Sequence, residues 1–221
     1  MDSLHRELLK VENLSVDFAT KQGTVHAVRD ISFQINTREI IGVVGESGSG
    51  KSVSMLAIMN LLADNATVTS GKIRFEGQDL SPAGLTTKAQ KNAHEKQMMD
   101  IRGKQIGMVF QDPMTFLNPV LKIGVQLTEG IIRHTKCTKE EAKKRAVELL
   151  AQVGISNPEK RLNQYPHQFS GGMRQRIIIA AALACNPKLL IADEPTTALD
   201  VTVQAQILSL IEGLVKGMGS S

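Results

Sequence analysis

The sequence has 221 residues, of which 42% are hydrophobic, so it can bury the core of one medium-sized domain. Its formal charge of +4 arises from lysines and arginines spread along the chain, a pattern that indicates no particular anionic partner. The lack of Trp and the single Tyr argue against a stacking platform for single-stranded nucleic acid, so we expect no nucleic-acid partner. No apolar run approaches the roughly 20 residues of a membrane-spanning helix, and Met1–Arg6 lacks a signal-peptide pattern. These features predict a cytoplasmic protein.

Strands alternate with helices along the chain, which predicts an α/β fold. Period-two patterns indicate strands over Leu8–Phe18 and Val25–Ile35, and the apolar run Ile40–Val44 is typical of a buried parallel strand. The further elements that we expect, in chain order, are a helix over 51–62, a strand over 72–75, a polar loop and exposed helix over 78–104, a strand over 106–110, helices over 124–165 and 170–184, a strand over 188–192, a helix over 202–216 and a flexible tail over 217–221.

Two helix starts are marked by residue type. Thr138 and Glu141 have the spacing of a capping box, in which each side chain accepts a hydrogen bond from the other residue's backbone N–H. Ser170 precedes two glycines and is expected to begin the helix that runs to Ala184. The two cysteines, Cys137 and Cys185, form no disulfide framework and are typical of a reducing compartment.

A glycine-rich pattern lies between the expected strand Ile40–Val44 and the helix that begins at Lys51. Glycines allow the backbone to wrap closely around phosphates, and the helix N-terminus adds positive potential. In this pattern the Lys51 ammonium reaches the β- and γ-phosphates, and the Ser52 hydroxyl binds Mg²⁺. The pattern predicts a P-loop nucleotide site, although GTPases, kinases and motor ATPases all remain open on this motif alone. Its residues are Gly45, Glu46, Ser47, Gly48, Ser49, Gly50, Lys51 and Ser52.

An acidic pair follows the apolar run Leu189–Ala192. Asp193 would stand at the end of a buried strand, where it can join the Mg²⁺ shell. Glu194 comes one residue later and is placed to accept a proton from the attacking water or to orient it. An ordinary strand that ends in acidic turn residues is the alternative for this motif taken by itself.

The stretch Phe169–Arg176 resembles the signature motif of ABC ATPases and lies just before the acidic strand, as it does in that family. Gln111 resembles the family's Q-loop, and the stretch 198–200 (Ala-Leu-Asp) resembles its D-loop. The resemblance covers roughly residues 8–216 and implies a single ABC ATP-binding domain. That domain would have a P-loop NTPase core, an N-terminal antiparallel β-subdomain and a helical insertion over about 112–170.

The resemblance implies ATP and Mg²⁺ as cofactors and gives roles to single residues. Glu194 and Gln111 would be catalytic, and Gln111 would also contact the Mg²⁺ ion. The other Mg²⁺ ligands would be Ser52 and Asp193. Phe18 would stack on the adenine ring, and a core-facing phenylalanine in a strand is the alternative.

The signature residues Ser170, Gly171 and Gly172 would act in trans, on the γ-phosphate bound by the other subunit of a head-to-tail dimer. Exposed N–H groups at a helix start suit that task because they attract anions. Asp200 of the D-loop would belong to the same nucleotide site. Met173 replaces the glutamine of the commoner family form, as in the peptide-importer subgroup, and removes one amide group that could contact the nucleotide.

Residues 111–119, 165–168 and 193–203 resemble ATP-binding subunits of bacterial dipeptide, oligopeptide and nickel importers. The implied function is ATP hydrolysis that energises the import of peptides or nickel. The implied partners are a second ABC ATPase subunit, identical or different, two integral membrane permease subunits and, indirectly, a periplasmic or extracellular solute-binding protein. The implied location is the cytoplasmic face of the bacterial inner membrane.

The family's switch histidine has no counterpart after Asp200, since the last histidine is His167 and the sequence ends at Ser221. We therefore expect a truncated chain whose central sheet is incomplete. A nucleotide-binding fragment that does not hydrolyse ATP is the alternative function. A soluble ABC ATPase of DNA repair or translation is less well supported, because neither a coiled-coil insertion nor a tandem cassette is present.

Overall fold

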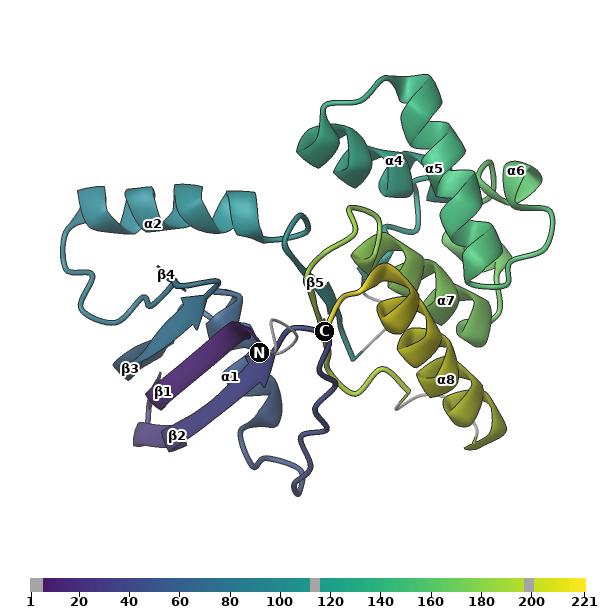
Figure 1. The fold of residues 1–221 in the computed structure, drawn as a ribbon. Coiled ribbons are helices and arrows are strands. Elements are labelled where there is room, and N and C mark those ends of the chain that lie inside the picture. The colour runs from purple at the N-terminus through teal and green to yellow at the C-terminus, as the bar shows by residue number, and fades with distance from the viewer. Residues whose placement is uncertain (1–5, 112–115, 197–200) are drawn as a thin grey trace. The chain divides into compact units, whose positions relative to one another are not determined.

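The computed structural model describes residues 6–111, 116–196 and 201–221, with only the backbone for Val201. The chain divides into two compact units, one of residues 1–102 with Ser221 and one of residues 103–220. An antiparallel sheet near the N-terminus is followed by alternating helices and strands (Figure 1). This arrangement confirms the expected α/β class.

The first unit contains a four-stranded antiparallel sheet in the order β2-β1-β3-β4 (Figure 1). On the central strand β1, Leu9, Val11, Leu14 and Val16 are buried in the core. Irregular pairing between Val11 and Leu14 shifts the alternation by one residue, so both halves of the strand keep an apolar face inward. The strands are β1 (Glu7–Thr20), β2 (Gly23–Asn36), β3 (Ala66–Phe75) and β4 (Gln78–Asp79).

Two helices belong to this unit, α1 (Lys51–Ile58) and α2 (Lys88–Ile101). Helix α2 begins at a capping box, in which the Gln90 N–H donates to Thr87 Oγ1 at 3.2 Å and the Thr87 N–H donates to Gln90 Oε1 at 3.0 Å. It buries only one face, which carries His94 and Met98. The exposed helix expected within 78–104 is therefore confirmed.

The run Ile40–Val44 does not form the buried parallel strand that its composition predicts. The described backbone there has no strand pairing, and the Val44 side chain is 93% exposed while Ile40 is 54% exposed. A strand exists only where a neighbour supplies its hydrogen bonds, so an apolar pattern alone cannot produce one. The sequence prediction is wrong at this segment for that reason.

The second unit contains a two-stranded parallel sheet of β5 (Ile106–Val109) and β6 (Leu189–Ala192), paired from Ile106 opposite Leu189 onward. All of β5 is buried. Within the described residues, no helix is long and apolar enough to cross a membrane. The helices of this unit are α4 (Ile123–Thr135), α5 (Lys139–Gln152), α6 (Pro158–Arg161), the 3-10 helix η1 (Pro166–Gln168), α7 (Gly171–Ala182) and α8 (Val201–Met218).

The helices of the second unit pack around one apolar cluster, to which α4, α5, α7 and α8 contribute. Helix α5 begins at the predicted capping box: the Thr138 N–H donates to Glu141 Oε2 at 2.8 Å, and the Glu141 N–H donates to Thr138 Oγ1 at 3.2 Å. The backbone and hydroxyl donors of Thr138 hold the pKa of Glu141 below its usual value. The local sequence thus fixes the start of a helix that brings Ala146 and Leu149 into the core.

The last five residues differ from the flexible tail that the sequence suggests. Helix α8 continues through Gly217 to Met218. The Ser220 hydroxyl is buried and donates to the Pro187 carbonyl at 2.6 Å. Ser220 and Pro187 lie far apart in sequence, so composition alone does not reveal that this end of the chain is held in place.

Two matched substitutions compare how much stability is contributed by a buried apolar residue of a paired strand and by an exposed one outside the sheet. We expect Ile73→Ala to lower the free energy of unfolding by about 2–5 kcal/mol, because Ile73 is 1% exposed in β3 and a cavity would remain. We expect Ile40→Ala, the same change at a half-exposed site, to cost about 0.5 kcal/mol or less. Urea denaturation of both variants measures the difference, and equal losses would contradict the exposed state of Ile40.

Candidate functional site

The phosphate-binding pattern forms an exposed loop that runs directly into α1. Gly50 is the N-cap residue of this helix and has a left-handed backbone with φ 91°. A Cβ at Gly50 would lie 2.6 Å from the Ala27 carbonyl oxygen of β2, and one at Gly45 would lie 2.7 Å from Ser49 Oγ. The loop therefore takes this shape only with glycine at Gly50, where both the backbone angle and the neighbouring strand exclude a side chain.

The start of α1 has the properties of an anion-binding helix terminus. Gly50 provides no side chain to cap the first-turn N–H groups, and a helix start without such a cap suits an anion. The Lys51 ammonium donates to the carbonyls of Gly45 and Glu46, at 2.7 and 2.9 Å. The predicted cation and the predicted loop thus lie together, and a side chain at Gly45 would clash with Ser49 Oγ at 2.7 Å. These features fit a phosphate group.

The second unit brings the two predicted catalytic residues into contact. Gln111, which follows β5, donates from Nε2 to Glu194 Oε2 at 2.8 Å, across 83 positions of sequence. This pairing arises because β5 and β6 are parallel neighbours, so that the segments after them leave the same edge of the sheet. Asp193 extends the ladder, since its N–H donates to the Val109 carbonyl at 2.9 Å.

Glu194 has a strained backbone. Its φ of 44° lies in the left-handed region, where a side chain with a Cβ costs about 1–2 kcal/mol. Strain of this kind persists where surrounding structure fixes it and is frequent at functional sites. The Gln111 amide and the strand pairing of the preceding residue, Asp193, hold the half-buried Glu194 carboxylate in place.

The signature stretch forms the start of α7, as the sequence predicts. Ser170 is the N-cap, and its Oγ accepts the Met173 N–H at 3.3 Å. Gly171 has open space where a side chain would be, while a Cβ at Gly172 would lie 3.5 Å from Val203 of α8. The exposed face of Ser170 and Gly171 leaves the helix start accessible to an anion.

Sequence reasoning did not identify the residues that hold the signature stretch in place. Phe169 is buried, and its ring lies 5.5 Å below the Arg161 guanidinium. Arg174 donates from Nε to the Phe169 carbonyl at 3.0 Å. A buried aromatic just before an N-cap serine is the sequence signal for such an anchor, because a residue there often packs against the following helix.

The remaining predicted site residues have simpler surroundings. Phe18 is half-buried in β1, opposite Val25 and Ala66, and its stacking role stays a prediction. Asp200 lies outside the described residues. Among the described residues, no three His, Cys, Asp or Glu side chains gather as a metal site.

Residues 28–197 match the family described as ABC transporter. The chain belongs to the ABC transporter family. Its fold agrees with that of solved cassettes: it has a TM-score of 0.80 to the dimeric structure of MJ0796, a bacterial ABC transporter cassette, with 28% identity over 96% of this chain and 85% of that one.

Several curated members of the ABC transporter family are much more similar in sequence. The oligopeptide transport ATP-binding protein OppD of Bacillus subtilis strain 168 is 56% identical over 97% of this chain and 57% of its own length. The dipeptide transport ATP-binding protein DppD of Escherichia coli strain K12 is 50% identical over 92% of this chain and 59% of its own length. The chain therefore spans less than two thirds of the length of these relatives.

The close approach at Gly50 gives a direct test of the loop. We expect Gly50→Ala to destabilise the chain by more than about 1 kcal/mol, because alanine is strained at positive φ and would meet the Ala27 carbonyl. Gly42→Ala is the matched control, since Gly42 has open space around it, and we expect it to be neutral or slightly stabilising. Thermal unfolding followed by circular dichroism would contradict the account if both variants shifted alike.

Proposed function

We propose that this chain is the ATP-binding and ATP-hydrolysing part of a bacterial peptide importer. The observation that carries the catalytic part of the proposal is the Glu194 carboxylate, held in a strained backbone and bound by Gln111 at 2.8 Å. The transported solute is proposed from the OppD and DppD relatives, whose names specify oligopeptide and dipeptide transport. Nickel is the other solute that the sequence resemblance allows, but neither relative described above is named for nickel transport.

The phosphate-binding loop binds the nucleotide in this proposal. The Lys51 ammonium exchanges its two loop carbonyls for the β- and γ-phosphates, a stronger charge-assisted interaction. Backbone N–H groups from Gly45 to Lys51 and the start of α1 surround the same phosphates. Phe18 stacks on the adenine ring. Ser52, Asp193 and Gln111 would hold Mg²⁺. When bound, this ion would neutralise charge on the phosphates.

Glu194 is the general base of the proposed reaction. Its carboxylate accepts a proton from the water that attacks the γ-phosphate, and Gln111 orients both the carboxylate and the water. A second ABC subunit contributes its own Ser170, Gly171 and Gly172 to the γ-phosphate, with Asp200 at the same interface. The dimeric state of the MJ0796 cassette supports such a pairing of subunits. Two permease subunits and a solute-binding protein complete the transporter at the cytoplasmic face of the inner membrane.

A second candidate is a nucleotide-binding chain that does not hydrolyse ATP. One observation favours it: the segment Ile40–Val44, which leads into the phosphate-binding loop, is exposed and unpaired in the described structure. A loop that is not held by a strand on that side would position the γ-phosphate less precisely against the general base, which lowers turnover more than binding. The two candidates differ only in turnover, so phosphate release by the parent chain separates them.

Removing the loop cation tests nucleotide binding. We expect Lys51→Ala to weaken MgATP binding by about tenfold or more, since a charge-assisted contact to phosphate contributes about 1.5–3 kcal/mol. Lys72→Ala, which removes an exposed lysine of β3 in the same unit, is the control and should leave the affinity unchanged. Isothermal titration with MgATP measures both, and equal affinities of Lys51→Ala and the parent would refute the phosphate role.

Removing the general base tests catalysis. We expect Glu194→Gln, within the assembled transporter, to keep MgATP binding and to slow phosphate release by about 100-fold or more. Glu212→Gln, in an exposed pair with Lys216 on α8, is the control for loss of one carboxylate. Phosphate release within a few-fold of wild type would show that Glu194 is not the base. Binding without turnover by the parent itself would favour the second candidate.

A further inference from the structure

Two cysteines of the second unit line the same small pocket. The pocket has a volume of about 260 Å³ and is lined by residues from the end of α4, the start of α5 and the segment after α7. Cys137 belongs to the connection from α4 to α5, and Cys185 follows α7. Both residues are half-buried, both thiols are free, and the sequence contains no other cysteine. The pocket therefore brings all of the chain's thiols to one place.

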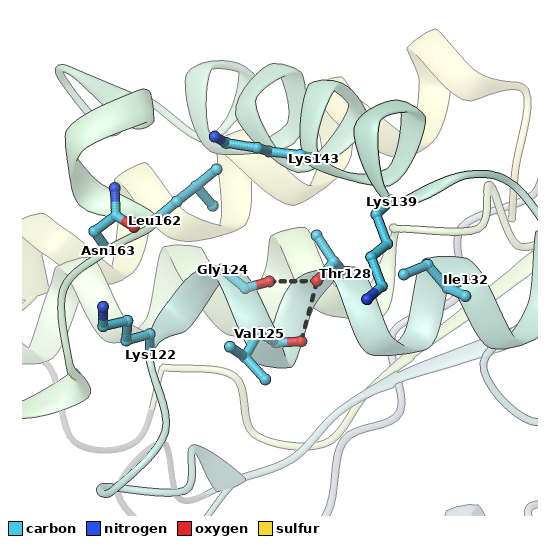
Figure 2. A pocket seen from close by; sticks show the side chains of 9 residues that line it. All are labelled: Lys122, Gly124, Val125, Thr128, Ile132, Lys139, Lys143, Leu162 and Asn163. Atoms are coloured by element: carbon cyan, nitrogen blue, oxygen red, sulfur yellow. Dashed lines mark hydrogen bonds between the residues drawn. The ribbon is translucent and has the colours of Figure 1, made fainter.

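The connection that carries Cys137 is fixed on both sides. The end of α4 lies beside the start of α5, where Ile132 and Lys139 face a common surface groove (Figure 2). Lys136 ends α4 with a left-handed backbone, φ 56°, and its N–H donates to the Ile132 carbonyl at 3.0 Å. Thr138, on the other side of Cys137, is the N-cap of α5 and is held by its capping box. The Cys137 thiol is thus presented from a short and well-fixed connection.

The segment that carries Cys185 is held against α4 and α5. The Asn186 N–H donates to the Leu183 carbonyl at 3.0 Å, and the Asn186 side chain accepts from Arg145 Nη2 of α5 at 2.5 Å. Cys185 Sγ lies 3.9 Å from the Gly130 carbonyl oxygen of α4, and a thiol is only a weak donor. The second thiol therefore has a fixed backbone but no strong partner within the described residues.

Other polar groups of the pocket are engaged within the protein. The Thr135 hydroxyl donates to the Ile131 carbonyl at 2.7 Å. The Glu141 carboxylate accepts from the N–H and the hydroxyl of Thr138, at 2.8 and 2.9 Å. Ile131 and Ala184 supply apolar lining. Sulfur atoms beside an apolar wall are therefore what this pocket offers to a ligand.

The protonation of Cys185 favours a metal ion over a reactive small molecule as that ligand. Burial raises the pKa of Cys185 above its usual value, the Arg145 guanidinium opposes this rise, and Cys137 adds to it. Because charge effects fall off with distance, the influence of Cys137 indicates that the two sulfurs lie near each other. A thiol with a raised pKa is a poor nucleophile, which disfavours its oxidation at neutral pH. A soft metal ion has no such requirement, since coordination itself removes the thiol proton.

Two sulfur ligands without a third donor suit Cu(I). Thiolates select soft ions such as Cu(I), and two of them on opposite sides of the ion satisfy it. Structural zinc sites use four ligands, whereas no three His, Cys, Asp or Glu side chains gather as a metal site in the described ranges. A reducing compartment, of which two free cysteines are typical, keeps both Cu(I) and the thiols in these states.

We propose that Cys137 and Cys185 bind one Cu(I) ion as its two ligands. Each thiol releases its proton to solvent as its Cu–S bond forms, so two thiolates and one Cu(I) together carry one negative charge. The Arg145 guanidinium in the same pocket offsets that charge. The bound ion joins the α4–α5 connection to the end of α7, lies entirely within the second unit and does not depend on nucleotide binding.

Competition with a coloured Cu(I) chelator tests the site. The fully reduced 221-residue chain is titrated anaerobically with Cu(I) in the presence of bathocuproine disulfonate, whose absorbance measures the copper that the protein does not hold. We expect one Cu(I) per chain. Cys137→Ser and Cys185→Ser should each weaken binding about 100-fold or more, since changes just outside a metal's ligands already cost about 10–100-fold.

Met99→Leu is the matched control for the loss of one sulfur atom. Met99 is 48% exposed on α2 of the first unit, so this variant should bind Cu(I) as the parent does. Circular dichroism of each variant confirms that it folds. X-ray absorption at the copper edge needs no variant, and for the parent it should show two sulfur neighbours.

The proposal fails if the parent holds Cu(I) no more tightly than the serine variants, if Met99→Leu loses as much affinity as they do, or if the copper lacks sulfur neighbours. Cu(I)-dependent dimers in gel filtration would show that the ion bridges two chains, which also overturns it. Oxidised glutathione provides the last arm. If it joins Cys137 to Cys185 in a disulfide while Cu(I) binds the parent and the serine variants alike, the pair is a redox site and the metal proposal is wrong.

Discussion

The contact between the phosphate-binding loop and the sheet rests on one constraint, the close approach of Gly50 to the Ala27 carbonyl of β2. A side chain at Gly50 would lie 2.6 Å from that oxygen, and the glycine's left-handed backbone turns the chain into α1 at this point. The loop therefore contacts the sheet at its helical end, where the proposed function places the N–H groups that bind phosphate. Its other end, Ile40–Val44, has no such attachment in the described structure. The shape of the loop at its helical end follows from the contact at Gly50.

The acidic residues of the second unit depend on a different interaction, the parallel pairing of β5 with β6. That pairing places the residues after the two strands side by side, so the Gln111 amide reaches the Glu194 carboxylate at 2.8 Å. The strained φ of Glu194 is maintained because Asp193, just before it, still belongs to the ladder. A rigid strand followed at once by a strained residue fixes the direction of one carboxylate, which is what a general base requires.

Local features of this chain could be predicted from sequence, and features that depend on distant partners could not. The capping box at Thr138 and the N-cap at Ser170 involve residues within three positions of each other, so residue type alone indicates them. The glycine-rich turn into α1 is predictable for the same reason, and its phosphate role stays a prediction. The strand predicted at Ile40–Val44 does not form, because a strand needs hydrogen bonds from a neighbouring strand and an apolar run does not specify that neighbour. The buried Ser220 hydroxyl and the cation above Phe169 depend on residues that sequence spacing does not connect.

Hydrogen exchange measured with and without nucleotide tests most directly the proposal that the glycine-rich loop and the acidic pair respond to one bound nucleotide. The account predicts that MgATP slows exchange of the backbone amides at residues 45–54 and also at Asp193 and Glu194, over the same concentration range. AMP, which lacks the β- and γ-phosphates, should protect neither segment. Protection that is absent from residues 45–54, or that AMP produces equally, would contradict the account.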